Sequence, residues 1–163
     1  HAPAFVPADE THPLRPLNCY AAAKIAGEVA ARYFIDNHGL EILTFRIMGA
    51  RAPSEMDANI ARVAQNPAGD TGLLWTRTDA RDVAAAARQA VETETVEPGV
   101  YNVTGVEVVL TTDSRDLIQR FCPGTELRTG LIGRRSPLSC ERARRAFGYA
   151  PRFVWSVEAR HPE

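Results

Sequence analysis

The sequence has no long hydrophobic run and almost no net charge. No stretch approaches the roughly 20 apolar residues that a membrane-spanning helix requires, and the formal net charge of the 163 residues is −1. A balance this close to neutral gives no general attraction for nucleic acids or for a membrane surface. We therefore expect neither as a partner. The apolar content of 45% is enough for a packed core at this length.

Cysteine and histidine are also scarce. Cys19, Cys122 and Cys140 are odd in number and far apart, which fits neither a disulfide framework nor the spacing of metal ligands. The four histidines do not cluster either: they are His1, His12, His38 and His161. We therefore expect no metal site, and we expect a reducing, cytoplasmic compartment.

Lysine is nearly missing, because Lys24 is the only one and every other basic side chain is arginine. Lysine is a compact point charge, whereas arginine is a broad fork that stays charged. Tyr20 lies four residues earlier, so in a helix both side chains share one face. An ammonium beside a phenol favours the phenolate and lowers the phenol's pKa from its reference of about 10. The pair is a candidate proton-transfer device, although this spacing also occurs on solvated helix faces.

The surrounding pattern predicts a helix followed by a strand. Asn18 suits an N-cap, the Ala-rich stretch after it favours helix to about Asn37, and His38-Gly39 supplies the C-terminal cap. Small residues along one face indicate tight packing on a sheet or another helix. Residues 40–47 then form a well-buried strand, which completes the αβ part of a βαβ unit.

One such unit cannot form a sheet, and the proline-rich segment 1–17 is an unusual beginning for a domain. We therefore expect the sequence to be the carboxyl-terminal part of a larger protein. The loop 49–53 follows the strand's carboxyl end, where open α/β sheets bind ligands. Further helices are expected at 55–66, after Asp79 to Glu92, after Thr112 to Phe121 and after Ser139 to Phe147, and short strands at 73–75, 100–103 and 126–128.

Several short stretches occur in a fixed order. They are Pro7-Ala8-Asp9-Glu10 to Pro16, Tyr20 to Lys24 with Glu28, Phe45-Arg46, Asp79 to Ala84, Tyr101-Asn102-Val103, and Arg142-Ala143 with Phe147-Gly148-Tyr149-Ala150-Pro151. In this order they resemble the carboxyl-terminal half of an extended short-chain dehydrogenase/reductase, the NAD-dependent epimerase/dehydratase family. The resemblance implies an α/β fold. Residues 1–50 would be the C-terminal part of a Rossmann-like, doubly wound parallel sheet, and residues 51–163 a small mixed α/β substrate-binding region.

The resemblance also implies site roles. Tyr20 would be the acid/base during hydride transfer to or from NAD or NADP, and Lys24 would hold the nicotinamide ribose and favour the phenolate. Ile47 and Gly49 would lie beside the nicotinamide. The candidate substrate ligands are Gly49, Arg51, Arg77, Arg134 and Arg135. A homodimer through the Tyr-Lys helix would be expected.

The chain departs from the family pattern in several places. It has no Gly-x-x-Gly-x-x-Gly, and the family's catalytic Ser/Thr would fall before residue 1. Gly49 stands where the family usually has Asn, and Trp75-Thr76-Arg77 replaces Arg-Asp-Tyr/Phe. Two hypotheses follow. The first is an NAD(P)-dependent oxidoreductase, epimerase or dehydratase acting on a sugar or nucleotide sugar. The second is a truncated, catalytically inactive binding or association module.

Overall fold

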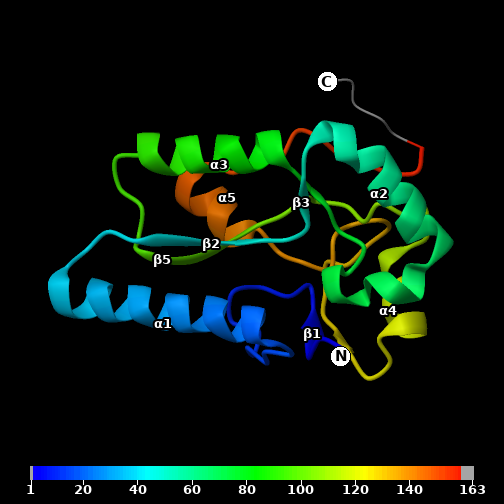
Figure 1. Cartoon of the computed structure of the whole chain (residues 1–163), viewed down its shortest axis with the longest axis horizontal. Coiled ribbons are helices and arrows are strands. Elements are labelled where there is room, and N and C mark those ends of the chain that lie inside the picture. The colour runs from blue at the N-terminus through cyan, green and yellow to red at the C-terminus, as the bar shows by residue number, and fades with distance from the viewer. Residues whose placement is uncertain (1, 159–163) are drawn as a thin grey trace.

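A small parallel sheet lies between two long helices. The computed structural model describes residues 2–158. Strand β2 (Leu43–Ile47) pairs in parallel with β5 (Gly99–Val103), which sets Arg46 opposite Asn102. Helix α1 (Cys19–His38) lies on one side of this sheet and α3 (Ala80–Glu92) on the other (Figure 1). This arrangement is the parallel α/β architecture expected from the sequence.

Helix α1 begins and ends as predicted. The Asn18 side chain accepts a hydrogen bond from the Ala21 N–H at 2.8 Å, and Gly39 closes the helix in the left-handed conformation. The predicted burial is wrong, however. α1 contains no buried residue, and β2 is half-buried, with Ile47 43% exposed. The reason is that β5 is the one strand paired with β2 among the described residues, so α1 has little sheet to cover.

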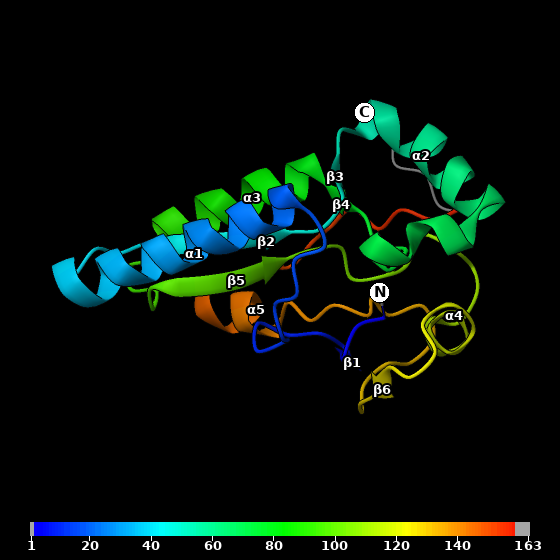
Figure 2. The same ribbon diagram turned by 60° about the horizontal axis from the view of Figure 1, so that its bottom comes forward.

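The other half of the molecule consists of short elements around a larger core. Its strands form two further parallel pairs, β1 (Phe5–Val6) with β6 (Glu126–Leu127) and β3 (Ala50–Arg51) with β4 (Thr78–Asp79). Figure 2 shows β1 and β6 close to α4. The remaining helices are α2 (Pro53–Gln65), the 3-10 segment η1 (Pro67–Leu73), α4 (Ser114–Phe121) and α5 (Glu141–Phe147).

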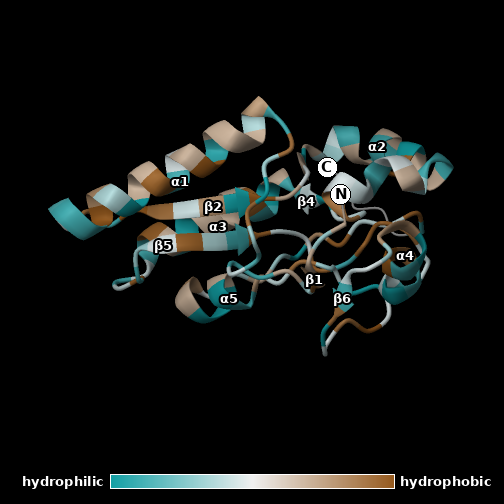
Figure 3. Ribbon diagram, turned by 90° about the horizontal axis from the view of Figure 1, so that it is seen from below, coloured by the Kyte–Doolittle hydropathy of each residue, from teal (hydrophilic) through white to brown (hydrophobic). Residues whose placement is uncertain are grey.

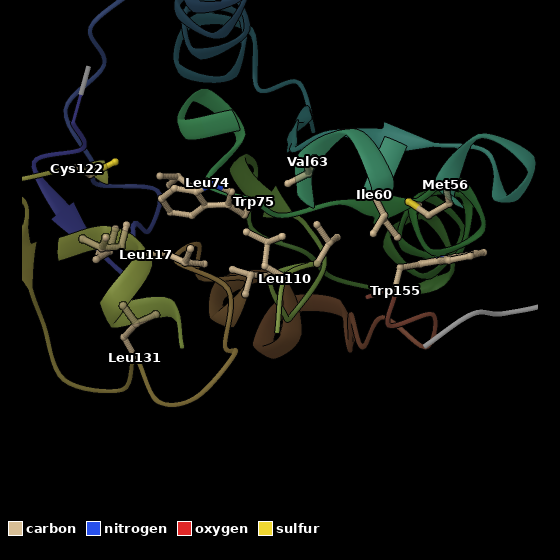
Figure 4. Packing of buried hydrophobic residues seen from close by; sticks show 14 residues of the cluster. Met56, Ile60, Val63, Leu74, Trp75, Leu110, Leu117, Cys122, Leu131 and Trp155 are labelled. Carbon is tan, nitrogen blue, oxygen red and sulfur yellow. The ribbon is translucent and has the colours of Figure 1, made fainter. Parts of the chain in front are cut away.

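Two hydrophobic clusters hold these parts together. The larger one extends from Met56, Ile60 and Trp155 at one end to Trp75 and Leu117 at the other (Figure 4). Val6 belongs to it and is fully buried, so the segment ahead of α1 is anchored in this core. The smaller cluster lies between the sheet and helices α3 and α5, and it contains Ala86, Ala90, Tyr101, Val103, Ala143, Phe147 and Tyr149.

The predicted strand at 73–75 is wrong. Leu73 ends η1, and Leu74 and Trp75 adopt left-handed backbone angles, with φ of 47° and 53°. This turn buries Trp75 completely, and its indole N–H donates to the Pro67 carbonyl at 2.7 Å. The apolar triplet therefore serves a buried turn, and the strand begins only at Thr78.

Smaller differences concern two caps. The N-cap of α4 is Asp113 rather than Thr112, because the Asp113 carboxylate accepts from the Arg115 N–H at 2.8 Å. The N-cap of α5 is Cys140 rather than Ser139. Because β2 pairs with β5, the sheet draws on both sides of the predicted division at residue 50. That division stays a prediction.

No helix within residues 2–158 is long and apolar enough to cross a membrane. His1 and His161 lie outside the described residues.

Gly105 lies where the chain leaving β5 crosses the segment before β4. A Cβ atom at this position would lie 2.1 Å from the Arg77 carbonyl oxygen. We expect Gly105→Ala to lower the free energy of unfolding by about 3 kcal/mol, since the backbone must move to relieve the clash. Urea denaturation would measure the change. Gly27→Ala in α1 is the control, because a Cβ there meets no atom within 4 Å and alanine favours helix. Equal stability of the two variants would contradict the expectation.

Asp79 caps α3, as the sequence predicts, and its side chain is fully buried. It accepts hydrogen bonds from the Arg81 N–H and guanidinium and, at 2.8 Å, from the Trp155 indole. Burial raises the pKa of Asp79, but these donors outweigh it and hold the pKa below the usual 3.8. The ionised carboxylate therefore stabilises the fold above about pH 4, and this contribution is lost as the pH falls through the folded-state pKa.

We accordingly expect Asp79→Asn to lower the free energy of unfolding by about 1–2 kcal/mol at neutral pH. The difference from the wild-type protein should shrink at acidic pH, where the wild-type carboxylate is protonated as well. Urea midpoints across the acid range would measure both effects. Asp113→Asn, at the half-exposed cap of α4, should cost less at neutral pH. If the stability difference between Asp79→Asn and the wild-type protein is the same at neutral and acidic pH, the ionised Asp79 carboxylate does not stabilise the fold.

Candidate active site

The first turns of α1 face a pocket of about 470 Å³, here called the Tyr20 pocket. Tyr20, Lys24 and Glu28 follow one another at intervals of four residues and all three line it. The Lys24 Nζ atom lies 5.3 Å from the centroid of the Tyr20 ring. The spacing predicted from the sequence is therefore realised on one helix face, at the carboxyl end of β2.

Four other segments complete the Tyr20 pocket. β2 and the residue after it contribute one wall, and the loop ahead of α1 contributes a second. The lining residues beyond α1 are Ala8, Asp9, His12, Leu14, Thr44, Phe45, Arg46, Ile47, Met48, Asn102, Thr104 and Leu138. The lining thus combines apolar and polar side chains.

The Tyr20 hydroxyl and the Lys24 ammonium have no hydrogen-bond or ion-pair partner in the described part of the chain. The Tyr20 side chain is also 69% exposed. Both groups are therefore available to a ligand that enters the pocket.

Glu28 and Arg46 form an ion pair beside them. The Arg46 Nε atom donates to Glu28 Oε1 at 2.8 Å and its Nη2 atom to Oε2 at 2.7 Å. Arg46 Nη1 also donates to the Glu10 carbonyl oxygen at 3.2 Å. The contacts of Arg46 are therefore those of a structural ion pair.

The loop ahead of α1 contributes residues that the sequence did not mark as site residues. Thr11 donates two hydrogen bonds to Asp9, and these hold the pKa of that carboxyl below its usual value. The His12 Nε2 atom accepts from the Ala4 N–H at 2.9 Å, and its Nδ1 atom lies 3.1 Å from the Pro13 carbonyl oxygen. The one sequence signal that could have marked Asp9 and His12 as pocket residues is their position just before the N-cap of α1.

Of the further predicted cofactor residues, Ile47 lines the Tyr20 pocket and Gly49 does not. Gly49 occupies a turn with φ of 57°, where a Cβ atom would lie 3.0 Å from the Thr76 carbonyl oxygen. Its packing explains the glycine. A role in contacting a ligand stays a prediction.

The four predicted substrate arginines are not brought together at the Tyr20 pocket. Arg51 donates to the Ala50 carbonyl oxygen, and Arg134 pairs with Glu107. Arg135 lines a separate pocket of about 230 Å³ beside Gly105. The Arg77 side chain is fully buried, and its partners are Asp70, Asn59 and the Thr76 carbonyl oxygen.

Among residues 2–158, no group of three or more His, Cys, Asp or Glu side chains is arranged to hold a metal ion.

The parallel α/β fold, with a Tyr-Lys helix beside the carboxyl end of a strand, defines a Rossmann-like protein of the short-chain dehydrogenase/reductase type. The model of the NAD dependent epimerase/dehydratase family matches residues 1–104, and the chain belongs to this family. A search among curated proteins gave no significant match.

Solved structures share the fold at low sequence identity. A short-chain dehydrogenase/reductase superfamily protein from Agrobacterium tumefaciens with bound NAD has a TM-score of 0.62 at 20% identity, over 93% of this chain and 58% of that one. MoeE5 in complex with UDP-glucuronic acid and NAD has a TM-score of 0.60 at 18% identity, over 94% and 56%. RMD from Pseudomonas aeruginosa complexed with NADPH has a TM-score of 0.56 at 23% identity, over 89% and 55%. The chain thus spans little more than half the length of these proteins.

Proposed function

We propose that this chain belongs to an NAD(P)-dependent oxidoreductase, epimerase or dehydratase that acts on a sugar or nucleotide sugar. The observation that carries the proposal is that two unengaged groups, the Tyr20 hydroxyl and the Lys24 ammonium, face one pocket. They lie within the segment that matches the family model. The UDP-glucuronic acid in MoeE5 supports the substrate class, and the NAD or NADPH in the solved structures supports a nicotinamide cofactor.

The residues of the Tyr20 pocket fit the nicotinamide end of such a cofactor. The free Lys24 ammonium suits the hydroxyls of a nicotinamide ribose, and the exposed Ile47 suits the nicotinamide face. No Gly-x-x-Gly-x-x-Gly occurs in the sequence, so these residues supply no cradle of that kind for the phosphates. When bound, a nicotinamide cofactor would supply the hydride chemistry.

This chain would supply the proton transfer. Tyr20 would take a proton from a substrate hydroxyl as that carbon is oxidised, or return it on reduction. Lys24 would stabilise the phenolate through its positive charge, since the ammonium lies 5.3 Å from the centre of the phenol ring. A positioned acid/base of this kind contributes about 10²- to 10⁴-fold to a rate.

The remaining roles are also proposals. Arg51, Arg134, Arg135 and Gly49 are candidate substrate ligands that lie outside the Tyr20 pocket, and the buried contacts of Arg77 support a structural role for it. We propose residues 51–163 as the substrate-binding region. α1 exposes hydrophobic positions along its length (Figure 3), and its exposed Val29, Tyr33 and Phe34 support a homodimer through this helix.

The test is turnover by the natural full-length protein. It would be incubated with NAD or NADP and, separately, with UDP-glucuronic acid or UDP-glucose, and the sugar would be followed by NMR. An epimerase changes the configuration of one carbon, a dehydratase releases water, and a dehydrogenase gives an oxidised sugar with NADH or NADPH. We expect one of these products. Tight binding of the cofactor without conversion of these or other nucleotide sugars would favour the inactive binding module.

A further inference from the structure

Helix α1 carries the proposed acid/base, and an ion pair ties it to strand β2. Within residues 2–158, the Glu28–Arg46 pair is the one ion pair or side-chain hydrogen bond that joins α1 to another element. This pair is therefore the specific side-chain link between α1 and the sheet in the described part of the chain.

The geometry of the pair suits it to fixing an orientation. The Arg46 guanidinium meets both carboxylate oxygens of Glu28, and the two side chains are 24% and 15% exposed. A bidentate contact sets direction as well as distance, and a partly buried pair is screened less by salt than a surface pair. A lysine at position 46 could keep the positive charge but could not make the same two-point contact with the carboxylate.

Arg46 is itself held from two sides. Its backbone is in β2, opposite Asn102 of β5, and its Nη1 atom donates to the Glu10 carbonyl oxygen. Glu10 is fixed in turn, because its carboxylate accepts from the Asn102 N–H at 2.7 Å. The guanidinium thus connects α1 to the sheet and to the loop that forms the second wall of the Tyr20 pocket.

Glu28 lies on the same helix face as the proposed catalytic pair. Tyr20, Lys24 and Glu28 are one turn apart in succession and line one pocket. A rotation or slide of α1 would therefore move all three side chains together. A displacement of about 1 Å in a reacting group is enough to lower a rate by about 10²-fold.

We propose that Arg46 is a positioning residue, which sets Tyr20 and Lys24 in the pocket by holding Glu28. The inference rests on the proposed function of Tyr20 as the acid/base. Arg46 takes no part in the chemistry itself. Its loss would misplace the reacting group without removing it.

The test compares Arg46→Met and Arg46→Lys with a matched control, Arg32→Met, in the natural full-length protein. Arg32 is also on α1 and pairs with Asp36 at 2.6 Å, but both side chains are exposed and the pair lies within the helix. The first readout is hydrogen–deuterium exchange of the α1 amides, which does not depend on the reaction. The second is the pair of constants kcat and KM with the best nucleotide sugar found.

We expect the α1 amides to exchange about tenfold faster in Arg46→Met and at the wild-type rate in Arg32→Met. We expect kcat to fall about 10- to 100-fold in Arg46→Met, with KM within about twofold, and Arg46→Lys to recover part of kcat.

Unchanged α1 exchange in Arg46→Met would overturn the inference. So would an unchanged kcat in Arg46→Met when Tyr20→Phe is inactive. Full activity of Tyr20→Phe would instead refute the proposed function, and the exchange readout would then still decide whether Arg46 holds α1.

Discussion

Tyr20→Phe is expected to lower turnover of the natural full-length protein by about 10²- to 10⁴-fold, which is the usual contribution of a positioned acid/base. The substitution removes only the hydroxyl of a side chain that is 69% exposed. The fold and the binding of the nicotinamide cofactor should therefore change little. Steady-state kinetics and calorimetric titration with NAD would measure the two effects separately.

Tyr33→Phe is the matched control. Tyr33 is on the same helix and is 54% exposed, but it does not line the Tyr20 pocket. Its substitution should leave kcat within about twofold. If both variants retain wild-type turnover, Tyr20 is not the acid/base. If both variants lose turnover alike, the loss reflects the stability or assembly of α1, and Tyr20 has no special role as acid/base.

Arg77→Met is expected to lower the free energy of unfolding by about 3–5 kcal/mol, because it removes one partner from a buried ion pair. The Arg77 side chain has no exposed surface, and the Asp70 side chain is only 12% exposed. Two guanidinium nitrogens donate to Asp70, at 3.0 and 2.6 Å, and Nε donates to Asn59 at 2.5 Å. Methionine would leave both partners without these donors.

Urea denaturation would measure the loss, and Arg144→Met provides the comparison. Arg144 also meets both oxygens of a carboxylate, that of Glu141, but these side chains are 60% and 42% exposed. Exposed pairs contribute little to stability, so Arg144→Met should cost much less than Arg77→Met. Should Arg77→Met fail to fold, Asp70→Asn weakens the same pair more gently. Wild-type stability of Arg77→Met together with lost substrate binding would show that Arg77 is a ligand instead.

The sequence predicted the features that depend on local chemistry. The bounds of α1 follow from the Asn18 cap, the run of alanines and the terminal Gly39, and all of these act within a few residues. The same holds for Asp79 at the start of α3. The alignment of Tyr20 with Lys24 required only a helical period.

Features that depend on distant partners could not be predicted. Nothing near Arg77 in the sequence indicates that Asp70 and Asn59, from η1 and α2, converge on its guanidinium. Likewise, the apolar residues at 73–75 match a strand until the indole of Trp75 finds its acceptor at Pro67 in a buried turn. Local patterns specify the elements, whereas the environment of each charged or aromatic side chain depends on how those elements pack.

The walls of the Tyr20 pocket illustrate the same limit. His12 and Leu138 are 126 residues apart in the sequence and line one pocket. The Glu28–Arg46 pair joins residues 18 positions apart on two different elements. The sequence predicted the alignment of Tyr20 with Lys24 but not the contacts of Arg46 and Glu28 beside them.

A crystal structure of the natural full-length protein with NAD and a nucleotide sugar would test the proposed function most directly. The measured quantity is the distance from the Tyr20 hydroxyl oxygen to the hydroxyl or carbonyl oxygen on the sugar carbon nearest the nicotinamide. We expect a hydrogen bond of about 2.6–3.2 Å, with the Lys24 ammonium on the nicotinamide ribose. A nicotinamide and sugar bound away from the Tyr20 pocket, with another side chain on the reacting oxygen, would contradict the proposed role of Tyr20.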